Sequence, residues 1–87
     1  MDSYKIEFKS NAWKDLKAIQ KPFVKKISNK IYQLSVNPFP HGFKKLKSSE
    51  TIYRIMVGEY RVIYSINQSL RLITVYYIRH RKDIYKN

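Results

Sequence analysis

Apolar and polar residues alternate at the start of the chain and then change to the spacing of a helix. Residues 4–8, YKIEF, have a period of two, which predicts a short strand with one buried face. The next apolar positions recur every three residues: Trp13, Leu16 and Ile19. Ser10 or Asn11 can serve as the N-cap of this helix, which is predicted to end near Gln20. Trp13 is the largest of its apolar residues and is expected in the core.

A second helix is predicted after a very short break. Pro22 suits its first turn, where a missing amide hydrogen costs nothing. Its apolar positions recur at intervals of three, four and three: Val24, Ile27, Ile31 and Leu34. Its other side carries the polar residues Lys25, Lys26, Asn29 and Lys30. Two such helices form a helical hairpin, which needs a sheet to cover its apolar stripe.

The second half of the chain has the alternation of strands. Residues 37–47, NPFPHGFKKLK, are predicted to be a loop because of their prolines and glycine, and the loop becomes basic toward its end. Three strand-like runs follow: IYRIMV at 52–57, YRVIYSI at 60–66 and LRLITVYYI at 70–78. Turns are expected at Gly58-Glu59 and around Asn67-Gln68. These runs predict an antiparallel meander, and the chain as a whole predicts an α+β fold with one sheet.

The turn at Gly58-Glu59 fixes how the two sides of the first hairpin are used. If these two residues form the turn, Val57 lies opposite Tyr60, and every other pair follows. One side is then apolar and is assigned to the helices: Tyr53, Ile55, Val57, Tyr60, Val62 and Tyr64. The other side holds Arg54, Met56, Arg61 and Ile63, because burying two arginines under a helix would be costly. The third run is apolar on both sides, so the side of Arg71 stays open.

Composition limits the chain to a small basic protein. Its 87 residues, 44% of them hydrophobic, are sufficient for one core, so residues 1–87 are expected to form a single domain. The net charge of +12 indicates a polyanionic partner, with nucleic acid as the leading candidate. The chain has no cysteine, and its start resembles neither a signal peptide nor a membrane span. We therefore expect a cytoplasmic location.

The order of these elements and two motifs carry a resemblance to a known family. The hairpin YRIMVGEYRVIY at 53–64 and the terminal segment IRHRKDIY at 78–85 resemble the RelE/ParE superfamily of type II toxins, in particular its RelE-like branch. The resemblance covers essentially the whole chain. It implies a ribosome-dependent endoribonuclease, or mRNA interferase, that cuts mRNA in the A site and inhibits translation. The implied partners are the 70S ribosome with its mRNA and an acidic, RelB-like antitoxin.

The chain is rich in the cations that such a nuclease uses and has few ordinary bases. Attack of an RNA 2′-hydroxyl on phosphorus requires a base for its proton, positive charge for the phosphorane and an acid for the 5′-oxygen. The resemblance implies that Arg61 and Arg81 hold the scissile phosphate. It also implies that Tyr85 stacks on or orients a nucleotide, and that Arg54 stands where some members have lysine. The further RNA-binding candidates are Lys45, Lys47 and His80.

Met56 departs from the family pattern. It stands where the best-known member has a lysine proposed as the base, and a thioether cannot exchange a proton. Met56 therefore argues against full activity, or the base is a neighbour such as Lys47 or His80. The 2 histidines and 6 acids show no paired ligand spacing, so we expect neither a metal site nor a cofactor. Three alternatives stay open: a ParE-like poison of DNA gyrase, a passive RNA-binding module, and a decayed member still bound by its antitoxin.

Overall fold

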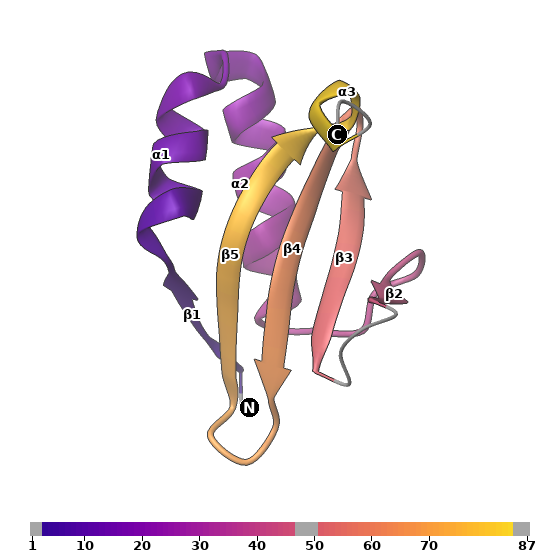
Figure 1. The fold of residues 1–87 in the computed structure, drawn as a ribbon. Helices are drawn as coiled ribbons and strands as arrows, with labels where there is room; N and C mark the ends of the chain where they lie inside the picture. Colours follow the sequence, from indigo (N-terminus) through magenta and orange to yellow (C-terminus); the bar gives the residue numbers. More distant parts are fainter. Residues whose placement is uncertain (1–2, 47–50, 85–87) are drawn as a thin grey trace.

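A five-stranded sheet forms the centre of the protein. The computed structural model describes residues 3–46 and 51–84. The elements in chain order are β1 (Lys5–Phe8), α1 (Ser10–Ala18), α2 (Lys21–Leu34), β2 (Lys44–Lys45), β3 (Ile52–Val57), β4 (Tyr60–Asn67), β5 (Leu72–His80) and α3 (Arg81–Ile84). The strand order is β1-β5-β4-β3-β2, with β1 parallel to β5 and the other pairs antiparallel (Figure 1). The predicted α+β fold, with its N-terminal strand, helical hairpin and meander, is confirmed.

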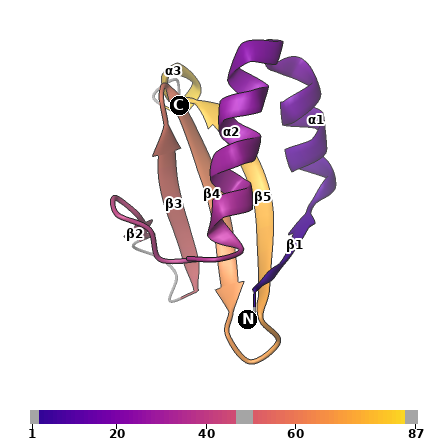
Figure 2. The same ribbon diagram turned by 180° about the vertical axis from the view of Figure 1, so that it is seen from behind.

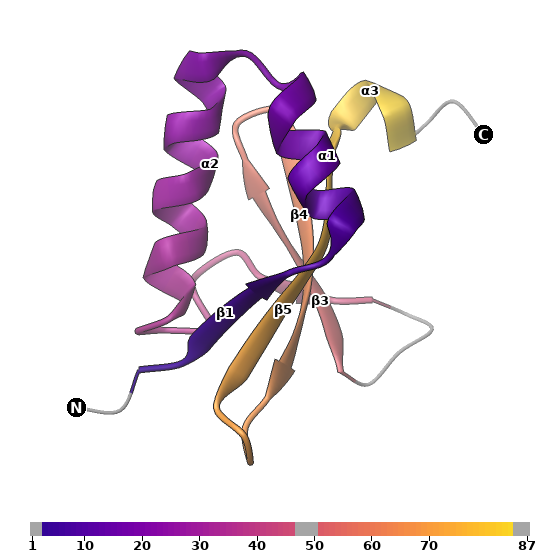
Figure 3. The same ribbon diagram turned by 90° about the vertical axis from the view of Figure 1, so that its left-hand side faces the viewer.

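The two helices leave one face of the sheet open. Viewed from behind, α2 runs across β4 and β5 (Figure 2). α1 packs against β5 beyond the point where the short β1 ends (Figure 3). We call the side under α2 the covered face and the opposite side the open face. Among residues 3–46 and 51–84, none of the helices combines the length and apolar content that a membrane span needs.

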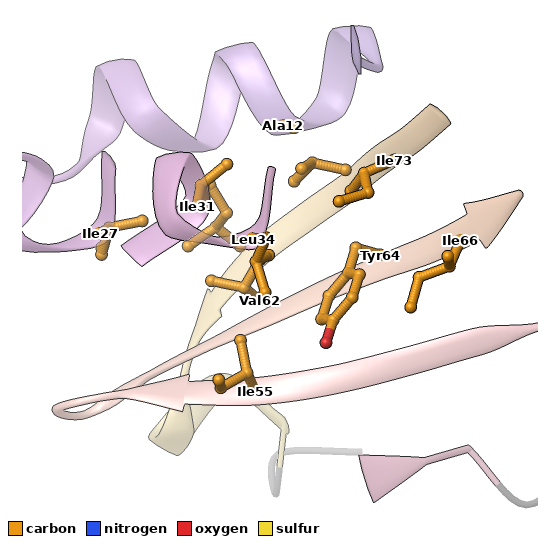
Figure 4. Close-up of a cluster of buried hydrophobic side chains, with 11 residues drawn as sticks. Ala12, Ile27, Ile31, Leu34, Ile55, Val62, Tyr64, Ile66 and Ile73 are labelled. Atoms are coloured by element: carbon orange, nitrogen blue, oxygen red, sulfur yellow. The ribbon is translucent and has the colours of Figure 1, made fainter. Parts of the chain in front are cut away.

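The core lies between the helices and the covered face. Figure 4 shows side chains of β3, β4 and β5 directed toward those of α1 and α2. Its fully buried members include Ala12, Ile27, Leu34, Val62, Tyr64, Ile73 and Val75. The Tyr64 hydroxyl donates a hydrogen bond to the carbonyl oxygen of Pro38 at 3.2 Å. Burial, and secondarily the nearby Tyr53, raise the pKa of Tyr64 to about 12. The tyrosine is therefore neutral and hydrogen-bonded within an otherwise apolar core.

The β3–β4 hairpin has the predicted register. Val57 lies opposite Tyr60, Met56 opposite Arg61 and Arg54 opposite Ile63. Gly58 adopts a φ of 60° in the turn, a conformation that glycine reaches without strain. Ile55, two residues before Val57, is buried on the covered face. A two-residue turn between alternating strands was thus sufficient to sort the two faces.

The first helix differs from the prediction in three respects. Its N-cap is Lys9, with no side-chain cap hydrogen bond, and the helix ends at Ala18. Trp13 is 52% exposed and lies against Phe8 with ring centroids 4.7 Å apart, so the prediction of a core tryptophan is wrong. Ala12 takes the core position instead. Ala12 lies four and seven residues before Leu16 and Ile19, so these three share one helix face, from which Trp13 is rotated by about 100°.

One strand was not predicted, and the start of another was placed two residues too early. The predicted loop at 37–47 contains β2, which pairs Lys44 with Arg54 and extends the sheet. The last strand begins at Leu72, two residues later than predicted, because Arg71 lies in the turn with a φ of 50°. The Arg71 guanidinium lies 4.9 Å from the centroid of the Tyr4 ring. Arg71 therefore lies in the turn before the last strand and belongs to neither side of that strand.

Candidate nucleic-acid interface

Four cationic side chains from four strands share the open face. Lys44 lies opposite Arg54 across β2 and β3, and Arg61 lies opposite Arg79 across β4 and β5. Residues directly opposite one another in antiparallel strands project to the same side. Met56 joins the two pairs, because it lies opposite Arg61 and is two residues from Arg54 on β3. We call Lys44, Arg54, Arg61 and Arg79 the cation row.

Arg61 occupies the middle of this face and is partly buried. Its Nε atom is buried and has no hydrogen-bond partner among the residues that the structure describes. Its neighbours across the strands are the thioether of Met56 and a second arginine, Arg79. A buried donor without an acceptor and two like charges in opposite positions both cost free energy. An anion bound beside Arg61 would remove both costs.

Arg79 is oriented by two contacts. Its Nε donates to an Asp15 carboxylate oxygen at 3.4 Å, and its guanidinium lies 4.8 Å from the centroid of the Tyr77 ring. The same Asp15 oxygen accepts the backbone N–H of Ile78 at 2.8 Å. Because β1 pairs with β5 only as far as Val75, this amide lies on an edge of β5 that no strand covers. Asp15 therefore closes the edge and holds the guanidinium of Arg79 through its Nε.

The sequence pattern did not single out Arg79. The third strand was predicted to end at Ile78 and is apolar on both sides, so its register could not be assigned. Arg79 could have been placed on the open face from two features of the sequence. Tyr77 and Arg79 alternate with the apolar Ile78, and Arg61 lies on the neighbouring strand. Lys44 was missed for a similar reason, since β2 was predicted as a loop. Lys45, which was singled out, lies opposite Tyr53 and so belongs to the other side.

The C-terminal candidates that the structure describes lie at the end of β5 and in α3, away from the cation row. Arg81 is exposed in α3, and its backbone N–H donates to the Glu59 carbonyl at 2.7 Å, which ties α3 to the β3–β4 turn. His80 lies opposite Tyr60, with ring centroids 5.1 Å apart, so it does not share a face with Arg61. Its Nδ1 accepts the backbone N–H of Lys82 at 3.0 Å. The remaining two candidates, Lys47 and Tyr85, lie outside the described residues.

The described part of the chain holds no group of three or more histidine, aspartate or glutamate side chains that could bind a metal ion. The chemical resources of the open face are therefore its cations, the tyrosines of β5 and the hydroxyl of Ser65. Such a surface is suited to holding phosphate groups and stacking bases.

Comparison with known proteins gives a consistent assignment. Residues 6–85 match a family model described as the ParE toxin of the type II toxin-antitoxin system parDE. The chain is 33% identical over 87 residues to RelE1 of Methanocaldococcus jannaschii, with 97% of each covered. The chain therefore belongs to the RelE/ParE superfamily of type II toxins.

Solved structures with the same fold agree with this assignment. RelE in the archaeal RelE–RelB complex from Pyrococcus horikoshii superposes with a TM-score of 0.81 at 25% identity, covering 91% of this chain and 96% of that chain. The RelB–RelE complex from Methanococcus jannaschii gives a TM-score of 0.76 at 28% identity, covering 92% and 95%. Both relatives were solved as toxin with antitoxin.

Proposed function

We propose that this toxin is a ribosome-dependent endoribonuclease that cleaves mRNA in the A site and so stops translation. The observation that carries the proposal is the buried Nε of Arg61 within the cation row, which has no hydrogen-bond partner in the described part of the chain. A phosphodiester bound there supplies the missing acceptor and separates the charges of Arg61 and Arg79. The similarity to RelE1 and to two archaeal RelE structures favours RNA as the substrate.

The proposed reaction is an intramolecular transesterification of RNA. The 2′-oxygen forms a bond to phosphorus, the bond from phosphorus to the 5′-oxygen breaks, and the products are a 2′,3′-cyclic phosphate and a 5′-hydroxyl. One proton leaves the 2′-hydroxyl and one is delivered to the 5′-oxygen. Arg61 and Arg79 stabilise the extra negative charge of the phosphorane, with Arg54 beside them. In this proposal the arginines take the electrostatic role that a metal ion has in other nucleases.

The C-terminal residues complete the proposed site from the end of the sheet. Arg81 would reach the phosphates from α3, next to the β3–β4 turn. Tyr85, which follows in the sequence, is proposed to stack on or orient a nucleotide. Lys47 is proposed to contact the RNA backbone. Lys45, which is exposed in β2 on the side away from the cation row, is proposed to contact the RNA backbone beyond the scissile phosphate.

The general base is not Met56, although Met56 lies directly opposite Arg61. A thioether neither accepts nor donates the proton of the 2′-hydroxyl. His80 is a poorer candidate than its sequence position suggested, because its ring faces Tyr60 and its Nδ1 is already used by a backbone amide. Lys47 is therefore the proposed base. Precise placement of the mRNA by the ribosome would supply the remaining rate acceleration.

The proposed partners are the 70S ribosome with its mRNA and a small acidic antitoxin of the RelB kind. The net charge of +12 supports both, because an acidic peptide and an RNA are attracted to the same basic surface. Such a peptide would fold on binding and compete with RNA for the cation row. Both archaeal relatives were solved with RelB, which supports the antitoxin.

A second candidate function is poisoning of DNA gyrase, because the matched family model is described as a ParE toxin. Fold alone does not separate the two functions. The cation row distinguishes them in practice: a gyrase poison retains its effect on DNA supercoiling when Arg61 is replaced, whereas a nuclease loses its cuts.

The proposed function is tested by primer extension on a defined mRNA in purified translating ribosomes. Wild type is compared with Arg61→Ala and Arg81→Ala, and naked RNA is the control. Cuts at A-site codons that need ribosomes and Arg61 support the proposal. A folded wild-type protein that makes no cuts contradicts it and makes the gyrase assay the next experiment.

A further inference from the structure

The pairing of β4 with β5 has one irregularity, and it changes which side chains reach the open face. Ile63 lies opposite Tyr77, but the next residue, Tyr64, lies opposite Val75. Tyr76 is therefore an extra residue in β5 with no partner in β4. Its hydroxyl lies 3.1 Å from the Ser65 hydroxyl, which is on the open face because Ser65 follows the buried Tyr64. The bulge thus brings two consecutive tyrosines to one side of the sheet.

These tyrosines line a hollow of about 450 Å³. The hollow, here called the tyrosine hollow, is bounded by Ile52, Ile63, Tyr76, Tyr77 and the residues Ser10 and Asn11 of the first turn of α1. Its floor is apolar, since Ile63 is only 3% exposed although it faces away from α2. The guanidinium of Arg79 over the Tyr77 ring holds that ring in place. The result is an aromatic and apolar recess in an otherwise cationic face.

The rim of the hollow has exposed hydrogen-bonding groups. The hydroxyl of Ser10 and the side-chain amide of Asn11 are exposed there, and α1 has no side-chain N-cap bond among the described residues. A hydroxyl and an amide can each donate and accept hydrogen bonds, as the edge of a nucleobase also does. A purely apolar ligand would leave these groups unused.

The hollow is adjacent to the cation row. Ile63, on its floor, lies directly opposite Arg54 and two residues from Arg61. Two residues along a strand span roughly 7 Å, so a phosphate beside Arg61 and a group in the hollow are close enough to belong to one nucleotide.

We propose that the tyrosine hollow binds one nucleobase of a single-stranded RNA whose adjacent phosphate lies beside Arg61. This inference rests on the proposed function and extends it, because it adds a base-binding site to a phosphate-binding face. The base lies against the tyrosine rings, and Ser10 and Asn11 meet its polar edge. The surrounding cations favour a polyanion, and an aromatic recess next to phosphate contacts is the arrangement by which single-stranded nucleic acids are held.

The test is binding, so that it does not depend on cleavage. The probe is a short fluorescent single-stranded RNA carrying 2′-O-methyl groups, which prevent attack by the 2′-oxygen. It is compared with a series in which each base in turn is replaced by an abasic residue. Wild type is expected to lose about tenfold in affinity at one position of the series, the size of one base stack.

Two variants remove the hollow in different ways. Tyr77→Ala deletes a stacking ring, and Ser10→Trp fills the hollow from an exposed position without altering the sheet. Both are expected to bind the intact and the abasic RNA equally. Tyr32→Ala is the matched control, because this ring is 74% exposed on α2, away from the open face, and its loss should leave the tenfold difference unchanged.

The inference is overturned if wild type binds intact and abasic RNA equally, if it binds neither, or if both hollow variants keep the tenfold difference. Ribosomal cutting without base-dependent binding would remove the base site and leave the proposed function intact. Base-dependent binding without ribosomal cutting would support the base site and contradict the proposed function.

Discussion

The two faces of the sheet are built from the same strands, but they differ in how they affect the free energy of folding and in what they can bind. On the covered face, Val62, Tyr64 and Val75 are fully buried and pack against the helices. On the open face, a buried donor of Arg61 has no partner within residues 3–46 and 51–84, and Arg61 lies opposite another arginine. The covered face accounts for folding, whereas the open face carries a free-energy cost that the proposed anion beside Arg61 would remove. Alternation along a strand permits this division because it separates the two roles by single residues.

The largest expected effect is on the open face. Arg61→Met removes the guanidinium and keeps an apolar stem, so cleavage on ribosomes should fall by a factor of about 100 to 1,000. Its free energy of unfolding should rise by about 1 kcal/mol, because a buried donor without a partner is removed. Primer extension and urea denaturation measure the two quantities.

Arg71→Met is the matched control for this change, since Arg71 has the same charge but lies in the β4–β5 turn. Cleavage by Arg71→Met should stay within about twofold of wild type. Equal losses in both variants would show that general charge, and not the open face, determines activity.

On the covered face, truncation should have the opposite consequence. Ile31→Ala leaves a cavity beneath α2, where Ile31 is 2% exposed, and should lower the free energy of unfolding by about 3 kcal/mol. Tyr32→Ala, its neighbour on the solvent side, should change it by less than about 0.5 kcal/mol. Urea denaturation measures both, and cleavage per folded molecule should be unaltered in each. A loss of cleavage by folded Ile31→Ala would break the separation of the two faces.

Alkaline pH should also act on the covered face. The pKa of Tyr64 is raised from 10.0 to about 12 by burial, so the folded state retains this proton more strongly than the unfolded state. Stability from this group is complete below pH 10 and is lost as the pH rises toward 12, by about 2–3 kcal/mol in total. Tyr64→Phe should flatten this part of the profile in denaturation experiments between pH 9 and 12. An unchanged slope in that variant would assign the alkaline loss to other groups.

The smallest effect is expected where the two faces meet, at the edge of β5. Asp15→Ala removes the acceptor of the Ile78 amide and should cost about 1 kcal/mol of stability, with faster hydrogen exchange at that amide. Asp15→Asn keeps an acceptor oxygen and should cost less. The ion pair of wild-type Asp15 with Arg79 is partly exposed and by itself adds little to the free energy of unfolding. Equal exchange rates in wild type and Asp15→Ala would show that Asp15 does not close this edge.

The β3–β4 hairpin was predictable from sequence because a two-residue turn and a period of two leave one register. That register places Arg54 and Arg61 on the open face, as the structure does. The third strand was not predictable, since it is apolar on both sides and contains the bulge at Tyr76. One extra residue reverses the side of every residue beyond it, which is why Arg79 and the tyrosine hollow were missed.

The first helix shows a different limit of sequence patterns. Ala12 and Trp13 are adjacent, and size favoured the tryptophan as the core residue. The structure buries the alanine because a small side chain lets α1 approach β5 closely, and the tryptophan packs at the margin against Phe8. Side-chain volume did not reveal that Ala12 is the core residue. The spacing of four and seven residues from Ala12 to Leu16 and Ile19 would have revealed it.

The most direct test concerns whether Arg61 and Arg79 form one phosphate site. Single-turnover cleavage of mRNA on programmed ribosomes would be measured for wild type, Arg61→Ala, Arg79→Ala and the double variant. Each single variant is expected to lose about 100-fold or more, and the double variant little beyond that, because groups that act as a unit are not additive. A wild-type rate for Arg79→Ala, or a double loss equal to the product of the two single losses, would contradict a shared site on the open face.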